Sequence, residues 1–200
     1  MMRRILAGLA LTLGACSVLP EKPPVALFDL SPPSGGAAAD ALPLRLAVAR
    51  PQASGPLASS WILVRPGGGQ IEVYPGAQWS EPLPGLVGTV LIEALEADGR
   101  IASVERAAAG LARDLELATE LRDFQIETTE GAVAVVRLKA SLIDPARGEV
   151  VASRLFESRQ PAAGREVSAA VAALDLALQR VLSELSDWVV ASRPAASGAD

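Results

Sequence analysis

The sequence of 200 residues contains no histidine. This absence excludes a Ser-His-Asp triad, a Cys-His dyad and a histidine-ligated zinc site within the chain. A serine–lysine mechanism would require Lys22 or Lys139, which are the two lysines of the chain. Lys22 falls in a proline-rich stretch, and Lys139 follows a strand pattern in which an exposed charge is the simpler interpretation. We therefore expect no catalytic residue, no metal site, no cofactor and no enzymatic activity.

Basic residues are also few. The chain has 18 lysines and arginines against 23 acidic residues, which gives a net charge of −5. Loss of Arg3 and Arg4 with an N-terminal signal would leave 16 basic residues and a net charge of −7. Nucleic-acid binding requires clustered lysines and arginines, so we expect no nucleic acid as a partner. Any attachment to a membrane is expected to come from a covalent lipid rather than from basic residues.

The one cysteine, Cys16, stands at the end of a signal pattern. Two arginines precede an apolar run, residues 5–13, which is shorter than the roughly 20 residues that a helix needs to cross a bilayer. Residues 13–16, Leu-Gly-Ala-Cys, resemble the bacterial lipobox. We expect cleavage before Cys16 and acyl chains on its thiol, which leaves no cysteine for a disulfide. A secreted protein with an incidental cysteine, or an uncleaved anchor, is the alternative interpretation.

Differences in composition divide the chain from Cys16 onward into three segments. Residues 16–41 are rich in proline, glycine and alanine and predict a lipidated flexible tether, roughly 25–30 Å long as a coil, that holds the domain clear of the bilayer. Within it, residues 25–30 form an apolar island that either adds an edge strand or lies on the domain. Residues 42–192 predict one α+β domain, and residues 193–200 a disordered tail.

The first half of the domain predicts strands and one helix. Alternating apolar residues indicate strands at 42–49, 61–64 and 71–74. The glycines at 67–69 are interpreted as a hairpin connection and not as a phosphate loop, because no Gly-Lys-Ser/Thr follows and the next element is a strand. A helix is expected to begin near Trp79-Ser80-Glu81-Pro82, with Ser80 as its cap, and to end at Gly99 in the left-handed conformation.

The second half predicts a strand at 100–104, then an antiparallel meander of three long strands at 111–127, 132–143 and 149–157. The final helix, 165–191, has apolar residues every 3.5 positions on average. This spacing is typical of a coiled-coil seam or of a helix lying across a sheet, and we favour the second. The expected fold is an α+β two-layer sandwich, in which two amphipathic helices cover one face of a mixed, mostly antiparallel sheet.

Several stretches then resemble one family. They are Arg50-Pro51, Trp61 to Arg65, Ile71 to Tyr74 and Ala77 to Pro84. Together they are similar to the auxiliary lipoproteins of ABC-type transport systems, the PqiC/YmbA-like group. The resemblance implies a non-enzymatic partner of an MCE-type (mammalian-cell-entry) lipid transport system, on the periplasmic face of the outer membrane. The implied partner is an MCE-domain protein. Ser17 after the cysteine is not the aspartate typical of inner-membrane retention, which favours the outer membrane.

Three aromatic residues are the expected contact with a protein partner: Trp61, Tyr74 and Trp79. Aromatic side chains supply much of the energy at interface centres, and only 4% of this chain is aromatic. We expect alanine at any of the three to weaken partner binding while the domain stays folded. The alternative is that Trp79 packs at the helix start and Trp61 fills the core.

A second function remains open at this point. The chain is alternatively a lipid-binding or envelope-assembly lipoprotein that acts without an ABC transporter. A deep apolar pocket between sheet and helices would favour this function, whereas a filled sandwich would favour the adaptor. The sequence also leaves open whether the protein forms a homo-oligomer.

Overall fold

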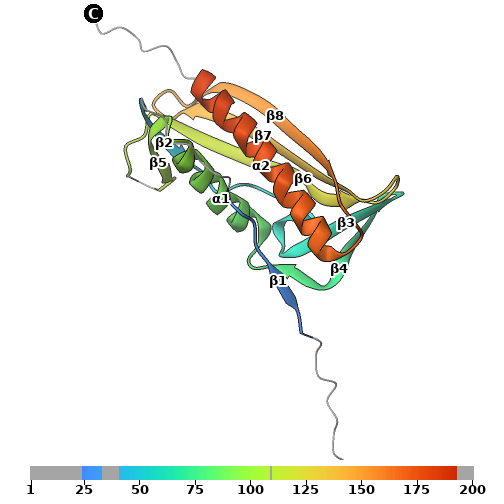
Figure 1. The fold of residues 1–200 in the computed structure, drawn as a ribbon. Helices are drawn as coiled ribbons and strands as arrows, with labels where there is room; N and C mark the ends of the chain where they lie inside the picture. Colours follow the sequence, from blue (N-terminus) through green and yellow to red (C-terminus); the bar gives the residue numbers. More distant parts are fainter. Residues whose placement is uncertain (1–23, 33–40, 109, 193–200) are drawn as a thin grey trace, which may run out of the picture.

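The computed structural model describes residues 24–32, 41–108 and 110–192. Cys16, the expected signal peptide and the expected tail at 193–200 lie outside these ranges. The described residues contain eight strands and two α-helices (Figure 1). In chain order these are β1 (Ala26–Phe28), β2 (Leu42–Val48), β3 (Trp61–Gly67), β4 (Gln70–Trp79), α1 (Leu83–Asp98), β5 (Ile101–Arg106), β6 (Leu115–Glu127), β7 (Val133–Asp144), β8 (Glu149–Pro161) and α2 (Val167–Ala191), with a short 3-10 turn at Gly55–Ala58.

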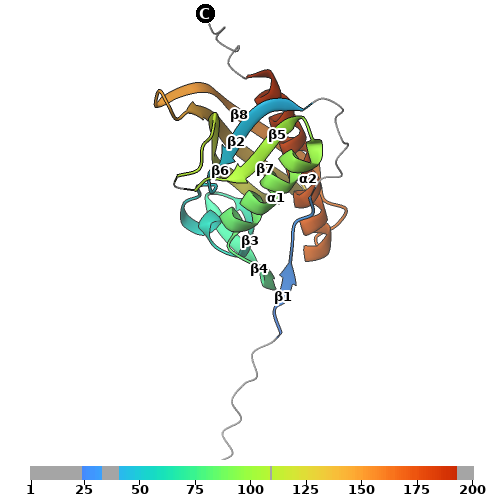
Figure 2. The same ribbon diagram turned by 90° about the vertical axis from the view of Figure 1, so that its left-hand side faces the viewer.

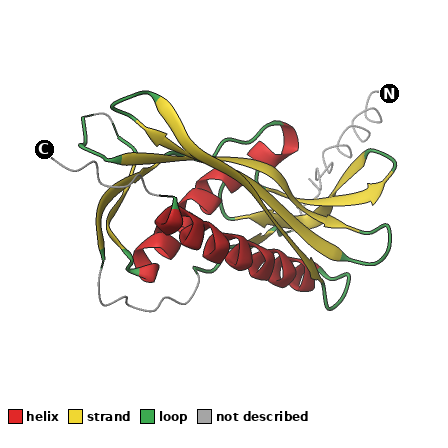
Figure 3. Ribbon diagram, turned by 90° about the horizontal axis from the view of Figure 1, so that it is seen from above, coloured by secondary structure: helices red, strands yellow, loops and turns green. Residues whose placement is uncertain are grey.

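The strands form one sheet, and both helices lie in front of it in Figure 1. Buried side chains of the two helices join a single core cluster with side chains from the sheet, so the helices cover the same face. Helix α2 packs on β7 and β8, and Figure 3 shows this long helix lying beside the strands. The predicted α+β two-layer sandwich is therefore confirmed. The 3.5-residue spacing of α2 reflects packing on a sheet and not a coiled-coil seam.

Strand β6 is the centre of the sheet. Along one side it pairs antiparallel with β7 over its whole length. On its other side, Leu115–Leu117 pair parallel with β2, and Gln125–Glu127 pair parallel with β3. The order β1-β4-β3-β6-β2-β5 continues outward from these pairings, and β7 carries β8. The sheet is mixed as predicted: its long pairings are antiparallel, while β1–β4 and β2–β5 are parallel.

Helix α1 begins at Leu83, later than the sequence predicts. Its cap position is Pro82, without a side-chain cap, so the prediction that Ser80 caps the helix is wrong. The backbone N–H of Leu83 instead donates to the carbonyl of Ser59, at 3.0 Å, the residue directly after the 3-10 turn. A tertiary contact thus takes over the role of a capping side chain. The predicted end is confirmed, since Gly99 has a left-handed φ of 71°.

The predicted hairpin at the glycine run is also confirmed. Strands β3 and β4 pair antiparallel, and Gly67 faces Gln70 across the turn. Gly68 and Gly69 have φ values of 61° and 80°, a region in which residues other than glycine are strained. Both strands extend beyond the ranges predicted from alternation.

The apolar segment at residues 25–30 packs against the rest of the domain. Strand β1 pairs parallel with β4, which makes the island an edge strand, one of the two outcomes expected. Leu30 is buried in the core, with 6% of its surface exposed. The backbone N–H of Ser31 donates to a carboxylate oxygen of Asp175 on α2, at 2.9 Å. Sheet and helix therefore fix a stretch that lies inside the expected tether.

Two glycines on α1 provide a stability test. A Cβ at Gly88 would lie 2.9 Å from Cδ of the Pro51 ring, whereas a Cβ at Gly85 would meet the mobile end of Glu81. Overpacking costs about 1–3 kcal/mol, which exceeds the roughly 0.5–1 kcal/mol that alanine gains over glycine in a helix. We expect Gly88→Ala to lower the free energy of unfolding by about 1 kcal/mol in urea titrations. Gly85→Ala is the control and should match or exceed the parent; equal loss in both variants would contradict this reading.

Candidate functional site

The face of the sheet opposite the helices, called the outer face here, carries two distinct surfaces. The first covers β1, β4 and β3 at one end of the molecule (Figure 2). Leu27, Gln78 and Trp61 are neighbours across these strands. Their chain neighbours Phe28, Trp79 and Ile62 pack into the core, so these three side chains point outward.

We call this surface the apolar half. Its exposed members have large apolar side chains that point away from the core. They are Val25 (49% exposed), Leu27 (64%), Trp61 (48%), Ile71 (40%) and Val73 (42%). Beneath them Leu63 and Val135 are buried but do not belong to the core cluster. Arg65 is the one charged residue that points outward from these strands, and its Nε donates to Gln125 at 3.1 Å. The outward positions within β1, β3 and β4 carry no carboxylate, while the exposed Asp29 follows β1 directly and Glu127 of β6 lies in register with Arg65.

The structure separates the three aromatic residues expected at a partner contact. Trp61 is exposed on the outer face. Trp79 is buried, with 1% of its surface exposed, and packs edge-on against Phe124 with ring centroids 5.7 Å apart. Tyr74 is half-buried beside the core, and burial, with the nearby charge of Glu166, raises the pKa of its hydroxyl. Of the three, Trp61 is the side chain that a partner can reach across an open surface.

The second surface is a recess of about 390 Å³ on the meander, which we call the basic recess. It is lined by Arg122, Arg137, Lys139, Ser153 and Leu155, and by Arg154, whose guanidinium lies over the Phe156 ring on the helix side. Most of these cations already have partners: Arg122 pairs with Glu120 at 2.7 Å, Arg137 with Asp123, and Arg154 with Glu184 at 3.8 Å. Lys139 has no ion-pair partner among the residues that the structure describes.

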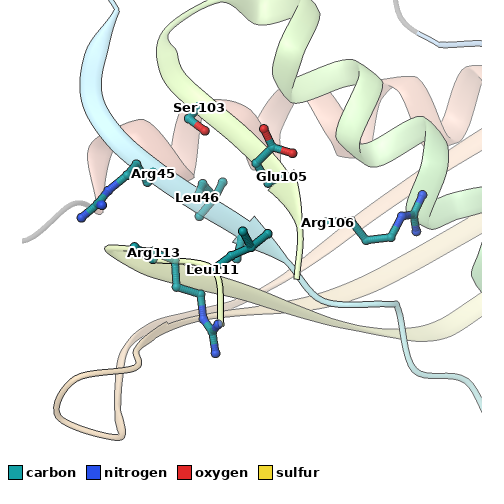
Figure 4. Close-up of a pocket in the computed structure, with 9 residues that line it drawn as sticks. Arg45, Leu46, Ser103, Glu105, Arg106, Leu111 and Arg113 are labelled. Atoms are coloured by element: carbon teal, nitrogen blue, oxygen red, sulfur yellow. The ribbon is translucent and has the colours of Figure 1, made fainter. Parts of the chain in front are cut away.

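Another pocket, of about 340 Å³, lies where β2 and β5 pair (Figure 4). Its arginines do not converge on a ligand. Arg45 binds Asp114 at 2.6 Å, and this hydrogen bond holds the pKa of the Asp114 carboxyl below its usual range. Arg113 lies 3.0 Å from Glu116. The Arg106 side chain extends away from the pocket centre in Figure 4. This pocket offers an apolar wall but no gathered set of polar groups.

Among the described residues, buried side chains of the sheet and of both helices pack against one another between the layers. Fully buried leucines from both layers meet there, among them Leu91, Leu117, Leu138, Leu178 and Leu182. Within the described ranges no group of three or more His, Cys, Asp or Glu side chains is placed to hold a metal ion. Within the residues that the structure describes, neither helix combines the length and the hydropathy needed to cross a bilayer.

The chain is similar to proteins of several bacteria. A protein of Bradyrhizobium diazoefficiens is 34% identical over 165 residues, which are 82% of this chain but 44% of that protein; this chain therefore spans less than half of that relative. A crystal structure from Xanthomonas campestris, a protein of the DUF330 family, superposes with a TM-score of 0.78 at 29% identity, covering 84% of this chain and 96% of the other. A Chlamydia trachomatis protein shares the fold alone, with a TM-score of 0.51 at 11% identity over 74% of this chain and 97% of the other.

The family match covers most of the domain. Residues 28–186 match the model of the ABC-type transport auxiliary lipoprotein component, from β1 to the last turns of α2. The match includes the Arg50-Pro51 pair, the β3–β4 hairpin and the Trp79 segment from which the resemblance was inferred. The chain belongs to the family of ABC-type transport auxiliary lipoprotein components.

Proposed function

We propose that the protein is a non-catalytic adaptor of an MCE-type ABC transport system for phospholipids. Acyl chains on Cys16 anchor it to the periplasmic face of the outer membrane, where it contacts an MCE-domain protein and so supports envelope integrity. Family membership supports the auxiliary role. Ser17, in place of aspartate, supports the choice of membrane.

The packing of buried side chains between the layers is the observation that carries this proposal. A protein that carries a lipid needs a cavity large enough to bury most of the ligand surface. Here the core cluster occupies the space between the layers, and the two pockets described above open on the surface. A packed domain with two separate outer surfaces suits an adaptor, which must contact a membrane and a protein partner at the same time. The alternative, a lipid-binding or envelope-assembly lipoprotein, would need an interior cavity.

The basic recess is the surface that we assign to the protein partner. Lys139 brings an ammonium group without an ion-pair partner to the middle of the meander, next to the exposed Leu155 in β8. Arg122 and Arg137 pair with Glu120 and Asp123, so Lys139 is the cation left to meet a carboxylate of the partner. Charge pairs at an interface select the partner and speed association.

Replacing Lys139 with glutamine tests this contact. Glutamine avoids placing a second carboxylate next to Glu120, its cross-strand neighbour. We expect a five- to tenfold loss of affinity for the MCE-domain protein, on the order of 1–1.4 kcal/mol, measured by co-purification and titration of the full chain. The affinity of the parent should fall as salt rises. Arg180→Gln, an equal charge change on the exposed side of α2, is the control and should bind normally.

Two results would count against the proposal in different ways. Equal binding by the Lys139 and Arg180 variants would remove the basic recess as the contact. Failure of the parent chain to bring down any MCE-domain protein would remove the adaptor function itself.

A further inference from the structure

The apolar half lies close to the expected lipid attachment. The first described range begins at Pro24, just before β1, so residues 17–23 alone separate Cys16 from Pro24. Eight steps of at most about 3.3–3.6 Å each give a reach of about 28 Å. Val25 and Leu27 of the apolar half follow directly. An anchor on Cys16 thus holds this surface near the bilayer at a high effective concentration.

We propose that the apolar half rests on the lipid bilayer, with Leu27, Trp61 and Val73 entering the interfacial layer. The inference deepens the proposed function, since it relies on the acylated Cys16. The ligand is a glycerophospholipid surface, and the chain contacts it through folded strands as well as through its acyl chains.

The chemistry of the apolar half fits a membrane surface. Contiguous exposed apolar side chains mark a surface that binds something, and tryptophan favours the boundary between acyl chains and head groups. A carboxylate would resist contact with the bilayer, and the outward positions within β1, β3 and β4 have none; Asp29, directly after β1, and Glu127 of β6, beside Arg65, mark the border of the surface. Arg65, held by Gln125 at the border of the surface, is placed to extend its guanidinium towards lipid phosphates.

The position of the apolar half favours lipid over protein as its occupant. The surface includes β1, the first element after the expected anchor, whereas the basic recess lies on the meander. Adjacent strands of a sheet are rotated by roughly 20–25°, so the two steps from β3, or three from β4, to β7, which carries Lys139, turn the recess away from the plane of the apolar half. This arrangement assigns Trp61, expected from the sequence to contact a protein, to the bilayer.

The lone cysteine makes a direct test possible. In the full-length lipidated protein Cys16 carries acyl chains, so a cysteine introduced at Val73 is the one free thiol. This thiol is labelled with a polarity-sensitive nitrobenzoxadiazole dye, and the protein is placed in vesicles of phosphatidylethanolamine and phosphatidylglycerol. In the parent protein, 42% of the Val73 surface is exposed. Leu155→Cys is the matched control, because Leu155 lies on the same face and is 51% exposed.

We expect the dye at residue 73 to shift its emission to the blue and to lose most of that emission when the vesicles contain lipids with a quencher on their acyl chains. The dye at residue 155 should stay in water and keep its emission. Two results would overturn the proposal: a dye at 73 that behaves like the one at 155, or a dye at 73 that is shielded from water but not quenched, which indicates protein contact. Flotation of the labelled protein with the vesicles reports the acyl anchor separately, so loss of the anchor is distinguished from loss of this contact.

Discussion

Replacing Trp79 with alanine is expected to lower the free energy of unfolding by about 3–5 kcal/mol. Trp79 is one of the largest fully buried side chains and packs against Phe124 of β6. Its backbone N–H donates to Ser60, at 2.8 Å, at the point where β4 leads into α1. The variant therefore loses apolar contacts in the core at the junction of two elements. Urea or thermal unfolding, followed by circular dichroism, measures the loss.

Trp61→Ala provides the comparison. This side chain is exposed by 48%, and exposed substitutions change stability by about 0.5 kcal/mol or less. If the two tryptophan variants were equally stable, the assignment of Trp79 to the core would fail. The contrast also corrects the expectation that alanine at Trp79 leaves the domain folded. Weak partner binding by a Trp79 variant would report damage to the fold and not a lost contact.

Replacing Cys16 with serine is expected to move the protein from the membrane fraction to the soluble periplasm. Each buried CH₂ of an acyl chain contributes about 0.8 kcal/mol, and two or more chains give stable anchoring. Loss of all chains therefore changes the partition by many orders of magnitude. The apolar half supplies only a weak, reversible attraction without them. Fractionation of cells and mass spectrometry of the N-terminal peptide measure the outcome.

A neighbouring substitution controls for effects of sequence alone. Ser17→Ala keeps the thiol and should stay in the membrane fraction with an acylated N-terminal peptide. A parent protein with a free thiol at Cys16, or a serine variant that remains fully bound to membranes, would contradict lipid anchoring at this residue.

Much of the fold follows from local patterns in the sequence. Alternation placed the meander and β2, and Asp98-Gly99 placed the end of α1, because these features depend on residues close together in the chain. The sequence pattern misplaces the start of α1, because this start depends on a contact between residues far apart in the chain. Its first N–H is satisfied by Ser59, more than 20 residues earlier, and no pattern near Ser80 reveals such a contact.

The exposed surfaces were harder to predict than the fold. Trp61 and Leu63 lie two positions apart along β3, whereas their partners on β4, Gln78 and Val73, lie five positions apart. This irregularity reverses the alternation, so Val73 points outward while Trp79 points into the core. A strict period of two would have placed both on one face. The basic recess likewise depends on register, because its cations come from β6, β7 and β8 and form no cluster in the sequence.

The central place of β6 has a consequence for the order in which the chain folds. Its partner segments in β2 and β3 lie 69 and 62 residues earlier, at Leu46 and Leu63 against Leu115 and Gln125. Before β6 joins, the earlier strands form two separate groups, β1-β4-β3 and β2-β5. Closing such long loops is entropically costly, and folding governed by distant contacts is slow. In a chain exported with its amino end first, residue 16 would therefore emerge before the strand that joins the two groups of the sheet.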